Sequence, residues 1–290
     1  MCEKIFLDYD QRQLNEQYDQ TTLVPNPGDY IKLWLKQTEL AKSEFPCKTD
    51  IAYGKKHVEK LDLFYPKDVS NYKVYPLLIF CHGGAWKALS KEHSGYLARV
   101  FVPQEIVFAA LDFGLVPDFT LDQVVTQVRR AAWYLYKNAQ QFHIHPEKIF
   151  VMGHSSGAHL ASNIAVTNWL EFGGPKNLIK GLTAISGPYN LEPVKLSARN
   201  EYLQLNESEV RKLSPINSIN DYFPPAVISW GGGELDEFKR QGSQFLNFWE
   251  RTGAVTKKVV LGGKNHFEMG SELANIEGRL FKAVLKQIKY

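Results

Sequence analysis

Residues 148–157 read Lys-Ile-Phe-Val-Met-Gly-His-Ser-Ser-Gly, and this stretch decides the fold. Its first five residues predict a buried strand, and the alanine-rich amphipathic run over 159–165 predicts a helix. Between the two, glycines flank Ser155 at positions 153 and 157, where larger side chains would collide with the strand or the helix. The pattern is typical of a nucleophile elbow, a tight turn that holds a hydroxyl group out at the carboxyl edge of a sheet.

Apolar runs alternate with helical stretches on both sides of this turn. The runs predict strands over 60–65, 75–81, 106–111, 148–152, 181–186, 226–230 and 257–261. The amphipathic stretches predict helices over 121–139, 241–252 and 273–288. Several strands show little polar alternation, as expected of strands covered on both faces. We therefore predict an α/β fold, the α/β-hydrolase fold, with a mainly parallel sheet flanked by helices and an active site outside the carboxyl ends of the strands.

The first fifty residues are polar and uneven. Residues 9–18 and 30–43 predict helices, and a turn cluster over 24–29 separates them. No linker follows that would define a separate domain. We expect a single domain over residues 1–290, in which 1–50 form an amino-terminal arm or partial cap and 51–290 form the catalytic core.

The composition is that of an ordinary globular protein of 290 residues with 44% hydrophobic residues. Its 34 basic and 31 acidic residues give a net charge of +3, which provides no reason to expect nucleic acid or an anionic membrane as a partner. The cysteines Cys2, Cys47 and Cys81 are too sparse for a disulfide framework. With no leader-like or membrane-spanning run, we expect a cytoplasmic protein that acts on a small molecule, and a homodimer is left open.

Ser155 needs a base, because a hydroxyl group is a poor nucleophile at neutral pH. His266 is the best candidate, since it lies in a glycine-bearing loop directly after the last predicted strand. The other histidines fit less well. We expect His57 and His93 at the surface, His143 and His145 at the opposite end of the sheet, His154 along the turn, and His159 packed within the next helix.

An acid should follow the penultimate strand, and three carboxylates compete there. Glu234 comes first after a glycine turn, where its side chain would face the sheet edge. Asp236 and Glu237 lie at a helix start, where unpaired N–H groups and the helix dipole already favour acids. We favour Glu234 and keep Asp236 as the alternative. The chain order Ser155, Glu234, His266 is then that of α/β-hydrolases, and not of the chymotrypsin or subtilisin folds.

Donors for an oxyanion are expected from His-Gly-Gly-Ala-Trp at 82–86, directly after the strand over 75–81. Glycines let backbone N–H groups turn towards a ligand oxygen. We expect the amides of Gly83, Gly84 and Ser156 to form the oxyanion hole. His82 should hold this loop by hydrogen bonding, and Trp86 should wall the pocket.

Metal and cofactor chemistry find no support in the sequence. Neither an H-E-x-x-H nor a C-x-x-C motif occurs. The Gly-Gly-Lys at 262–264 departs from a phosphate-binding loop, because lysine stands where its first glycine belongs and asparagine where serine or threonine belongs. We expect neither a metal nor a cofactor.

These motifs resemble those of α/β-hydrolases of the hormone-sensitive-lipase branch, and more closely those of kynurenine formamidases, also called arylformamidases. Residues 82–86 fit the H-G-G-x-W motif of the branch, and the elbow continues as in the family through Ala-His-Leu at 158–160. The likeness extends over nearly the whole chain, through residues 14–18, 120–123, 187–193 and 237–241. In three places the chain departs from the family: Ala85 replaces a frequent tyrosine, Ser156 a usual alanine, and Glu234 a frequent aspartate.

The resemblance implies hydrolysis of N-formyl-L-kynurenine to L-kynurenine and formate, a step of tryptophan catabolism. A carboxylesterase that acts on small acyl or aryl esters would use the same residues and is the alternative. A non-catalytic binding protein with a hydrolase fold is a third interpretation, although all three residues of a triad are present.

Overall fold

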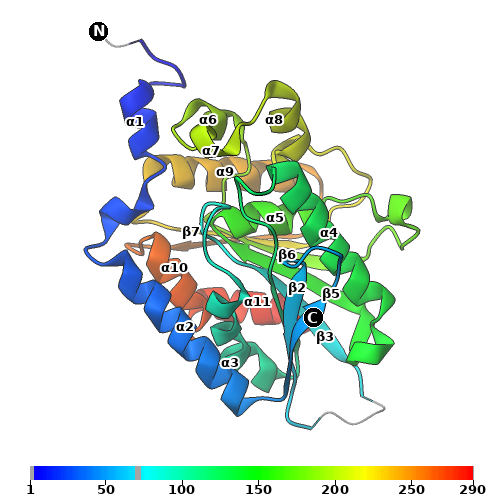
Figure 1. Ribbon diagram of the computed structural model, residues 1–290. Coiled ribbons are helices and arrows are strands. Elements are labelled where there is room, and N and C mark those ends of the chain that lie inside the picture. Colours follow the sequence, from blue (N-terminus) through cyan, green and yellow to red (C-terminus); the bar gives the residue numbers. More distant parts are fainter. Residues whose placement is uncertain (1–2, 69–72, 290) are drawn as a thin grey trace.

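An eight-stranded sheet forms the centre of the protein (Figure 1), and the computed structural model describes residues 3–68 and 73–289. Cys2 lies outside the described residues. The strand order is β1-β2-β4-β3-β5-β6-β7-β8, in which β2 pairs antiparallel with both of its neighbours and every other pair is parallel. The strands are β1 (Cys47–Ala52), β2 (Lys60–Phe64), β3 (Tyr75–Cys81), β4 (Val107–Leu111), β5 (Ile144–His154), β6 (Ile179–Ile185), β7 (Ala226–Gly231) and β8 (Thr256–Leu261).

The predicted strands are confirmed, and β1 is an addition. Residues 47–52 are mostly exposed and half of them are polar, because β1 is the edge strand beside β2. A strand of this kind carries no apolar run, and hydrophobic patterning therefore misses it.

Helices cover both faces of the sheet. The longer ones are α2 (Pro27–Glu44), α4 (Leu121–Lys137), α5 (Ser156–Ala165), α9 (Asp236–Arg251), α10 (His266–Leu273) and α11 (Arg279–Lys289). The shorter ones are α1 (Gln11–Glu16), α3 (Ala98–Phe101), α6 (Glu192–Leu196), α7 (Asn200–Leu203) and α8 (Glu207–Leu213). One hydrophobic core lies under α4, α5 and α9, and the other under α2, α3, α10 and α11.

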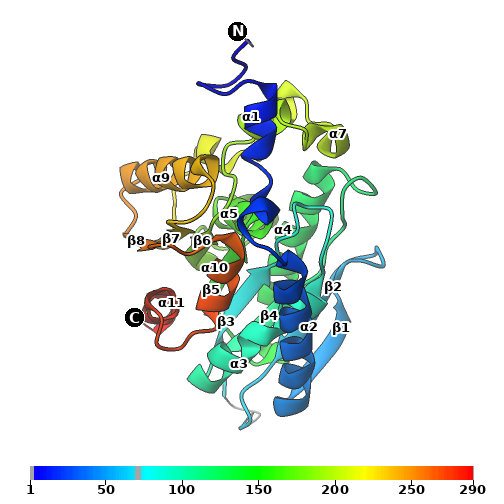
Figure 2. The ribbon, with the colours of Figure 1, turned by 90° about the vertical axis from the view of Figure 1, so that its left-hand side faces the viewer.

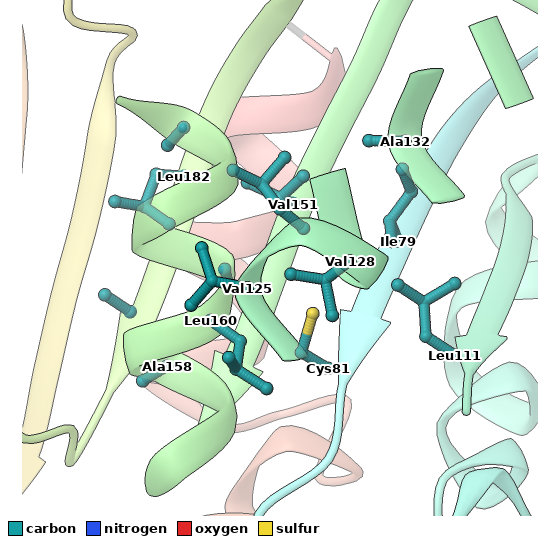
Figure 3. Close-up of a cluster of buried hydrophobic side chains, with 14 of the residues drawn as sticks. Ile79, Cys81, Leu111, Val125, Val128, Ala132, Val151, Ala158, Leu160 and Leu182 are labelled. Atoms are coloured by element: carbon teal, nitrogen blue, oxygen red, sulfur yellow. The ribbon is translucent and has the colours of Figure 1, made fainter. Parts of the chain in front are cut away.

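Side chains of the central strands divide between these two cores. Ile79 of β3 and Val151 of β5 face α4 and α5, as Figure 3 shows, whereas Phe80 and Met152 face the opposite core. All four are buried, and each such side chain stabilises the fold by about 1.5–3 kcal/mol. Burial on both faces explains why these strands lack polar alternation.

Two helix predictions need correction. The stretch 273–288 is not one helix, because α10 ends at Leu273 and a turn closed by the Gly278 amide on the Asn275 carbonyl (2.8 Å) precedes α11. The helix predicted from residue 241 begins at Asp236, since the buried Phe238 belongs to its apolar face.

The amino-terminal arm spans both layers. Leu14 and Tyr18 pack into the core under α4, α5 and α9, whereas Trp34 and Ala41 of α2 pack into the other core. Figure 2 shows the chain between α1 and α2 crossing from one layer to the other in front of the sheet. Among the described residues, no helix combines the length and hydrophobicity needed to cross a membrane.

Candidate active site

Ser155 lies at a strained turn between β5 and α5. Its backbone angles are φ 58° and ψ −131°, a left-handed region that costs a residue with a side chain on the order of 1–3 kcal/mol. The flanking glycines are required. A Cβ at Gly153 would lie 2.1 Å from the carbonyl oxygen of Gly157, and one at Gly157 would lie 2.1 Å from that of Cys81. This crowding holds the serine at the carboxyl edge of the sheet.

His266 meets Ser155 from the other side of the sheet edge. It is the first residue of α10, where the capping box of Asn265 and Glu268 fixes the start of the helix. The Nε2 atom of His266 lies 2.9 Å from the Oγ atom of Ser155, and both side chains are buried. The structure therefore brings together two residues that are 111 positions apart in the sequence.

Glu234 faces the other nitrogen of the same imidazole ring. Its Oε2 atom lies 3.6 Å from Nδ1 of His266, and neither atom has a hydrogen-bond partner among the described residues. Its Oε1 atom accepts hydrogen bonds from the Ser186 hydroxyl group (2.5 Å) and the Gly231 amide (3.1 Å). These two bonds orient the carboxylate, so that only Oε2 faces the histidine.

The competing acids lie elsewhere. The side chain of Asp236 is 75% exposed and pairs with Lys239 at 2.8 Å, one turn along α9. Glu237 is fully buried, where Arg240 and the Tyr18 hydroxyl group donate hydrogen bonds to it. Of the three candidates, the structure places only Glu234 beside His266.

The loop over 82–89 lies against the serine. A Cβ at Gly83 would lie 3.1 Å from the Cβ of Ser155, which shows how closely the backbone approaches. Gly84, Ala85 and Trp86 have φ angles of 100°, 53° and 61°, all in the left-handed region. The amides of Gly83 and Gly84 donate to no group in the described part of the chain, so both N–H groups remain available to a ligand.

Hydrogen bonds and stacking hold this loop in place. His82 donates through Nδ1 to the Gly83 carbonyl oxygen at 2.8 Å, and its ring stacks on Phe113 at 4.2 Å. The structure corrects the expectation that Trp86 walls the pocket, because Trp86 is fully buried and does not line it. Its Nε1–H donates to Nδ1 of His159 (3.3 Å) and its amide to Oγ of Ser156 (3.2 Å), so Trp86 ties the loop to α5.

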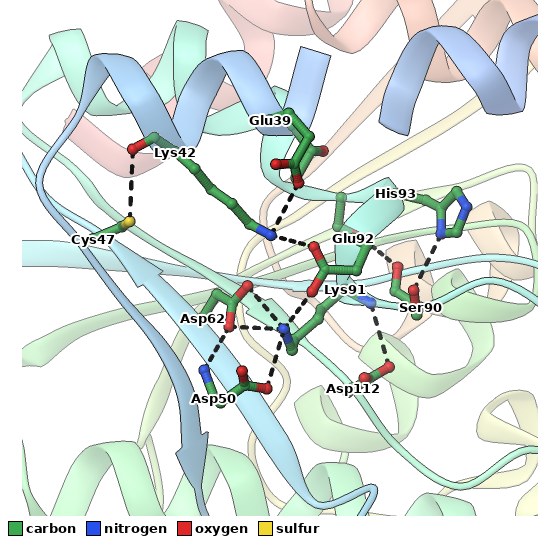
Figure 4. A network of polar contacts seen from close by, with 12 residues as sticks. Glu39, Lys42, Cys47, Asp50, Asp62, Ser90, Lys91, Glu92, His93 and Asp112 are labelled. Atoms are coloured by element: carbon green, nitrogen blue, oxygen red, sulfur yellow. Dashed lines mark hydrogen bonds and ion pairs between the residues drawn. The ribbon is translucent and has the colours of Figure 1, made fainter. Parts of the chain in front are cut away.

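A cluster of ion pairs surrounds the buried Lys91, just after the loop (Figure 4). The Nζ atom of Lys91 contacts Asp62 at 3.0 Å, Glu92 at 2.5 Å and Asp50 at 3.4 Å. The Lys91 amide also donates to Asp112 at 3.3 Å. Removal of Lys91 would leave the buried Asp62 carboxylate without its cation, so we expect Lys91 to be required for the local fold.

Three other histidines, His93, His154 and His159, are packing or lining residues. Burial, together with the adjacent His266, lowers the pKa of His154 well below its usual value, and burial lowers that of His159 to about 4. His159 donates through Nε2 to the Leu213 carbonyl oxygen at 2.8 Å. His93 was expected at the surface, but it is half-buried and lines the pocket, and burial lowers its pKa.

The pocket above Ser155 has a volume of about 670 Å³. Its walls come from the amino-terminal arm, the loop over 82–89, the segment over 197–202, and His266 with Phe267. Sequence reasoning missed the lining residues of two of these walls: Tyr18, Gln20, Trp34, Arg199 and Tyr202. No local motif marks them, because the arm and the segment over 197–202 come near the serine only in the folded chain. Within the described residues, no group of three or more His, Cys, Asp or Glu side chains could hold a metal ion.

Comparison with known proteins shows which family the chain belongs to. The BD-FAE family model matches residues 61–239. A kynurenine formamidase from Danio rerio is 30% identical over 87% of this chain and 85% of its own length. An isoprenylcysteine alpha-carbonyl methylesterase from Arabidopsis thaliana is 26% identical over 76% of this chain and 56% of its own length.

The fold has solved counterparts as well. A bacterial protein from Silicibacter sp. TM1040 superposes with a TM-score of 0.82 at 23% identity, covering 96% of this chain and 99% of its own. With the family match, the relatives and the hydrolase topology in agreement, the chain belongs to the kynurenine formamidase family of α/β-hydrolases and is a hydrolytic enzyme of the arylformamidase or esterase type.

Proposed function

We propose that the protein hydrolyses N-formyl-L-kynurenine to L-kynurenine and formate, with Ser155, Glu234 and His266 as a catalytic triad. One observation carries the proposal: His266 lies 2.9 Å from the Ser155 hydroxyl group through Nε2 and faces the buried Glu234 carboxylate through Nδ1. A histidine held between a serine and a carboxylate can take the serine proton and is stabilised as a cation when it does so. The likeness to kynurenine formamidases supports the choice of substrate.

The first half of the reaction forms a formyl-enzyme. Oγ of Ser155 attacks the formyl carbon while Nε2 of His266 takes its proton. The amides of Gly83, Gly84 and Ser156 donate to the oxyanion, and one such donor typically lowers the barrier by about 3 kcal/mol. His266 then gives the proton to the aniline nitrogen, the C–N bond breaks, and L-kynurenine leaves. An aryl amine is a better leaving group than an alkyl amine, so this apparatus suffices.

The second half returns the free enzyme. Water attacks the formyl ester on Ser155 as His266 takes one of its protons. The tetrahedral intermediate collapses, His266 returns the proton to Oγ, and formate leaves. Glu234 keeps the imidazole in the tautomer that presents an unprotonated Nε2 to the serine.

The arm over residues 1–50 has a place in this proposal. Tyr18, Gln20, Ile31 and Trp34 line the pocket, although all precede the first strand. We infer that the arm is part of one domain with the core and acts as a partial cap, because it supplies a wall that the sheet edge lacks.

A carboxylesterase is the second candidate, and the likeness to the methylesterase from Arabidopsis thaliana favours it. The test compares kcat/KM for N-formyl-L-kynurenine with that for p-nitrophenyl butyrate in the same preparation. We expect the formamide to be the better substrate. A large preference for the ester would reject the formamidase function and leave the esterase.

A further inference from the structure

One wall of the pocket carries a cation that forms no ion pair with any described residue. Arg199 lines the pocket from the segment that leads into α7. Its Nη2 atom donates to the Tyr18 carbonyl oxygen at 2.6 Å, and its guanidinium carbon lies 5.2 Å from the centre of the Tyr18 ring. Its Nη1 atom is buried and has no hydrogen-bond partner among the described residues.

The buried carboxylate that contacts the same tyrosine already has its own partners. Glu237 pairs with Arg240 and accepts the Tyr18 hydroxyl hydrogen bond. The two acids on the pocket wall, Asp19 and Glu201, are exposed, so water screens their charge. A half-buried guanidinium with no carboxylate partner among the described residues has N–H donors without acceptors, and an anionic ligand would accept hydrogen bonds from them.

A second buried donor lines the same pocket. Gln20 is 5% exposed, and its Nε2 atom has no partner in the described part of the chain. The Oε1 atom of Gln20 accepts a hydrogen bond from the Leu235 backbone amide at 3.5 Å, so the side-chain nitrogen of Gln20 is not used in that contact. Gln20 lies two residues after Tyr18, whose carbonyl group holds Arg199, so the two donors come from neighbouring parts of the wall.

We propose that Arg199 and Gln20 form a subsite for a carboxylate on the leaving group of the substrate. The planar guanidinium presents donors in a fixed fork that matches a carboxylate, and the glutamine adds a neutral donor. The subsite selects substrates whose aryl amine or alcohol carries an acid over neutral analogues of the same shape. The subsite adds a substrate preference to the proposed function, and it depends on that function only because this pocket is taken as the substrate site.

The experiment compares two pairs of ligands that differ in a carboxylate. N-formyl-L-kynurenine and N-formylkynuramine are tested as substrates, and L-kynurenine and kynuramine as inhibitors of p-nitrophenyl butyrate hydrolysis. In Arg199→Gln, we expect KM for N-formyl-L-kynurenine and Ki for L-kynurenine to rise about 10- to 100-fold, the range typical of a lost charge-assisted hydrogen bond. Values for the two kynuramine ligands should change less than about threefold.

Two further variants separate binding from folding. Arg211→Gln alters an exposed arginine outside the pocket and should leave all four constants unchanged. Gln20→Met keeps the volume and removes the donor, together with the acceptor of the Leu235 amide at 3.5 Å. Only the lost donor distinguishes acid from neutral ligands, so this variant should raise only the constants of the carboxylate ligands, even where Arg199→Gln fails to fold.

The outcomes distinguish the two proposals. If Arg199→Gln and Gln20→Met affect acid and neutral ligands equally, or if the unaltered enzyme does not prefer the acids, the subsite is refuted. If the enzyme fails to hydrolyse N-formyl-L-kynurenine but L-kynurenine inhibition still depends on Arg199, the subsite stands and the formamidase function falls.

Discussion

Replacement of Glu234 by glutamine tests how the histidine is oriented. Oε1 of Glu234 accepts hydrogen bonds from Ser186 and Gly231, so an oxygen must stay at that position in the variant. The amide nitrogen then takes the place of Oε2, 3.6 Å from Nδ1 of His266. An N–H group there opposes a protonated Nδ1 and favours the tautomer with its proton on Nε2. That tautomer cannot accept the proton of Ser155.

The expected cost is a fall in kcat of about 10⁴-fold, as is typical when a triad acid becomes an amide. In free energy this is about 5 kcal/mol of lost transition-state stabilisation. Thermal stability should change little, because glutamine has the same shape and removes a buried charge. Initial rates of p-nitrophenyl acetate hydrolysis measure the first quantity, and the unfolding midpoint Tm measures the second.

Asp236→Asn is the matched control. Its carboxylate is exposed and, among the described residues, pairs only with Lys239; pairs of this kind contribute about 0–1 kcal/mol. We expect activity within about twofold of the unaltered enzyme. The reasoning is refuted if Asp236→Asn loses more activity than Glu234→Gln, or if Glu234→Gln keeps a tenth or more of the rate.

Three further predictions concern the elbow and its supports. Gly157→Ala would set a Cβ 2.1 Å from the Cys81 carbonyl oxygen, so we expect a loss of stability above about 3 kcal/mol in urea unfolding, whereas Gly28→Ala, with open space around it, should be tolerated. His159 has a pKa of about 4 in the folded protein and about 6.5 in the unfolded chain, so it takes up a proton when the protein unfolds in acid. The free energy of unfolding should therefore fall by about 2–3 kcal/mol as the pH falls from about 6.5 to about 4.5. A stability profile that does not flatten in His159→Asn would contradict this. Trp86→Phe leaves Nδ1 of His159 without its hydrogen-bond donor and should lower the free energy of unfolding by about 1–3 kcal/mol. It should also lower kcat more than it alters KM. An unchanged kcat would show that the loop does not need this hydrogen bond.

The three proposed triad residues could be predicted because each of them lies in the turn that follows a strand. Ser155, Glu234 and His266 come after β5, β7 and β8, and the carboxyl ends of parallel strands meet at one edge. The glycine turns gave a second signal, since only glycine fits the crowded positions at the elbow.

The rest depended on packing between distant segments. The bond between Arg199 and the Tyr18 carbonyl oxygen joins residues 181 positions apart, and no periodicity reports such a contact. The prediction that Trp86 lines the pocket was wrong for the same reason: its hydrogen-bond partners Ser156 and His159 lie on α5, far from Trp86 in the sequence. The turn between α10 and α11 was missed because apolar residues on both sides of it suggested one continuous helix.

Covalent labelling of the serine tests the central claim most directly. Diethyl p-nitrophenyl phosphate transfers its phosphoryl group to a serine activated by a histidine and releases nitrophenol. We expect one equivalent of nitrophenol per chain, loss of activity in step with its release, and a peptide map that places the phosphoryl group on Ser155. Ser155→Ala should keep its Tm, take up no label and lose activity by at least about 10⁴-fold. A label on another residue, or hydrolysis by Ser155→Ala at a rate near that of the unaltered enzyme, would contradict the account.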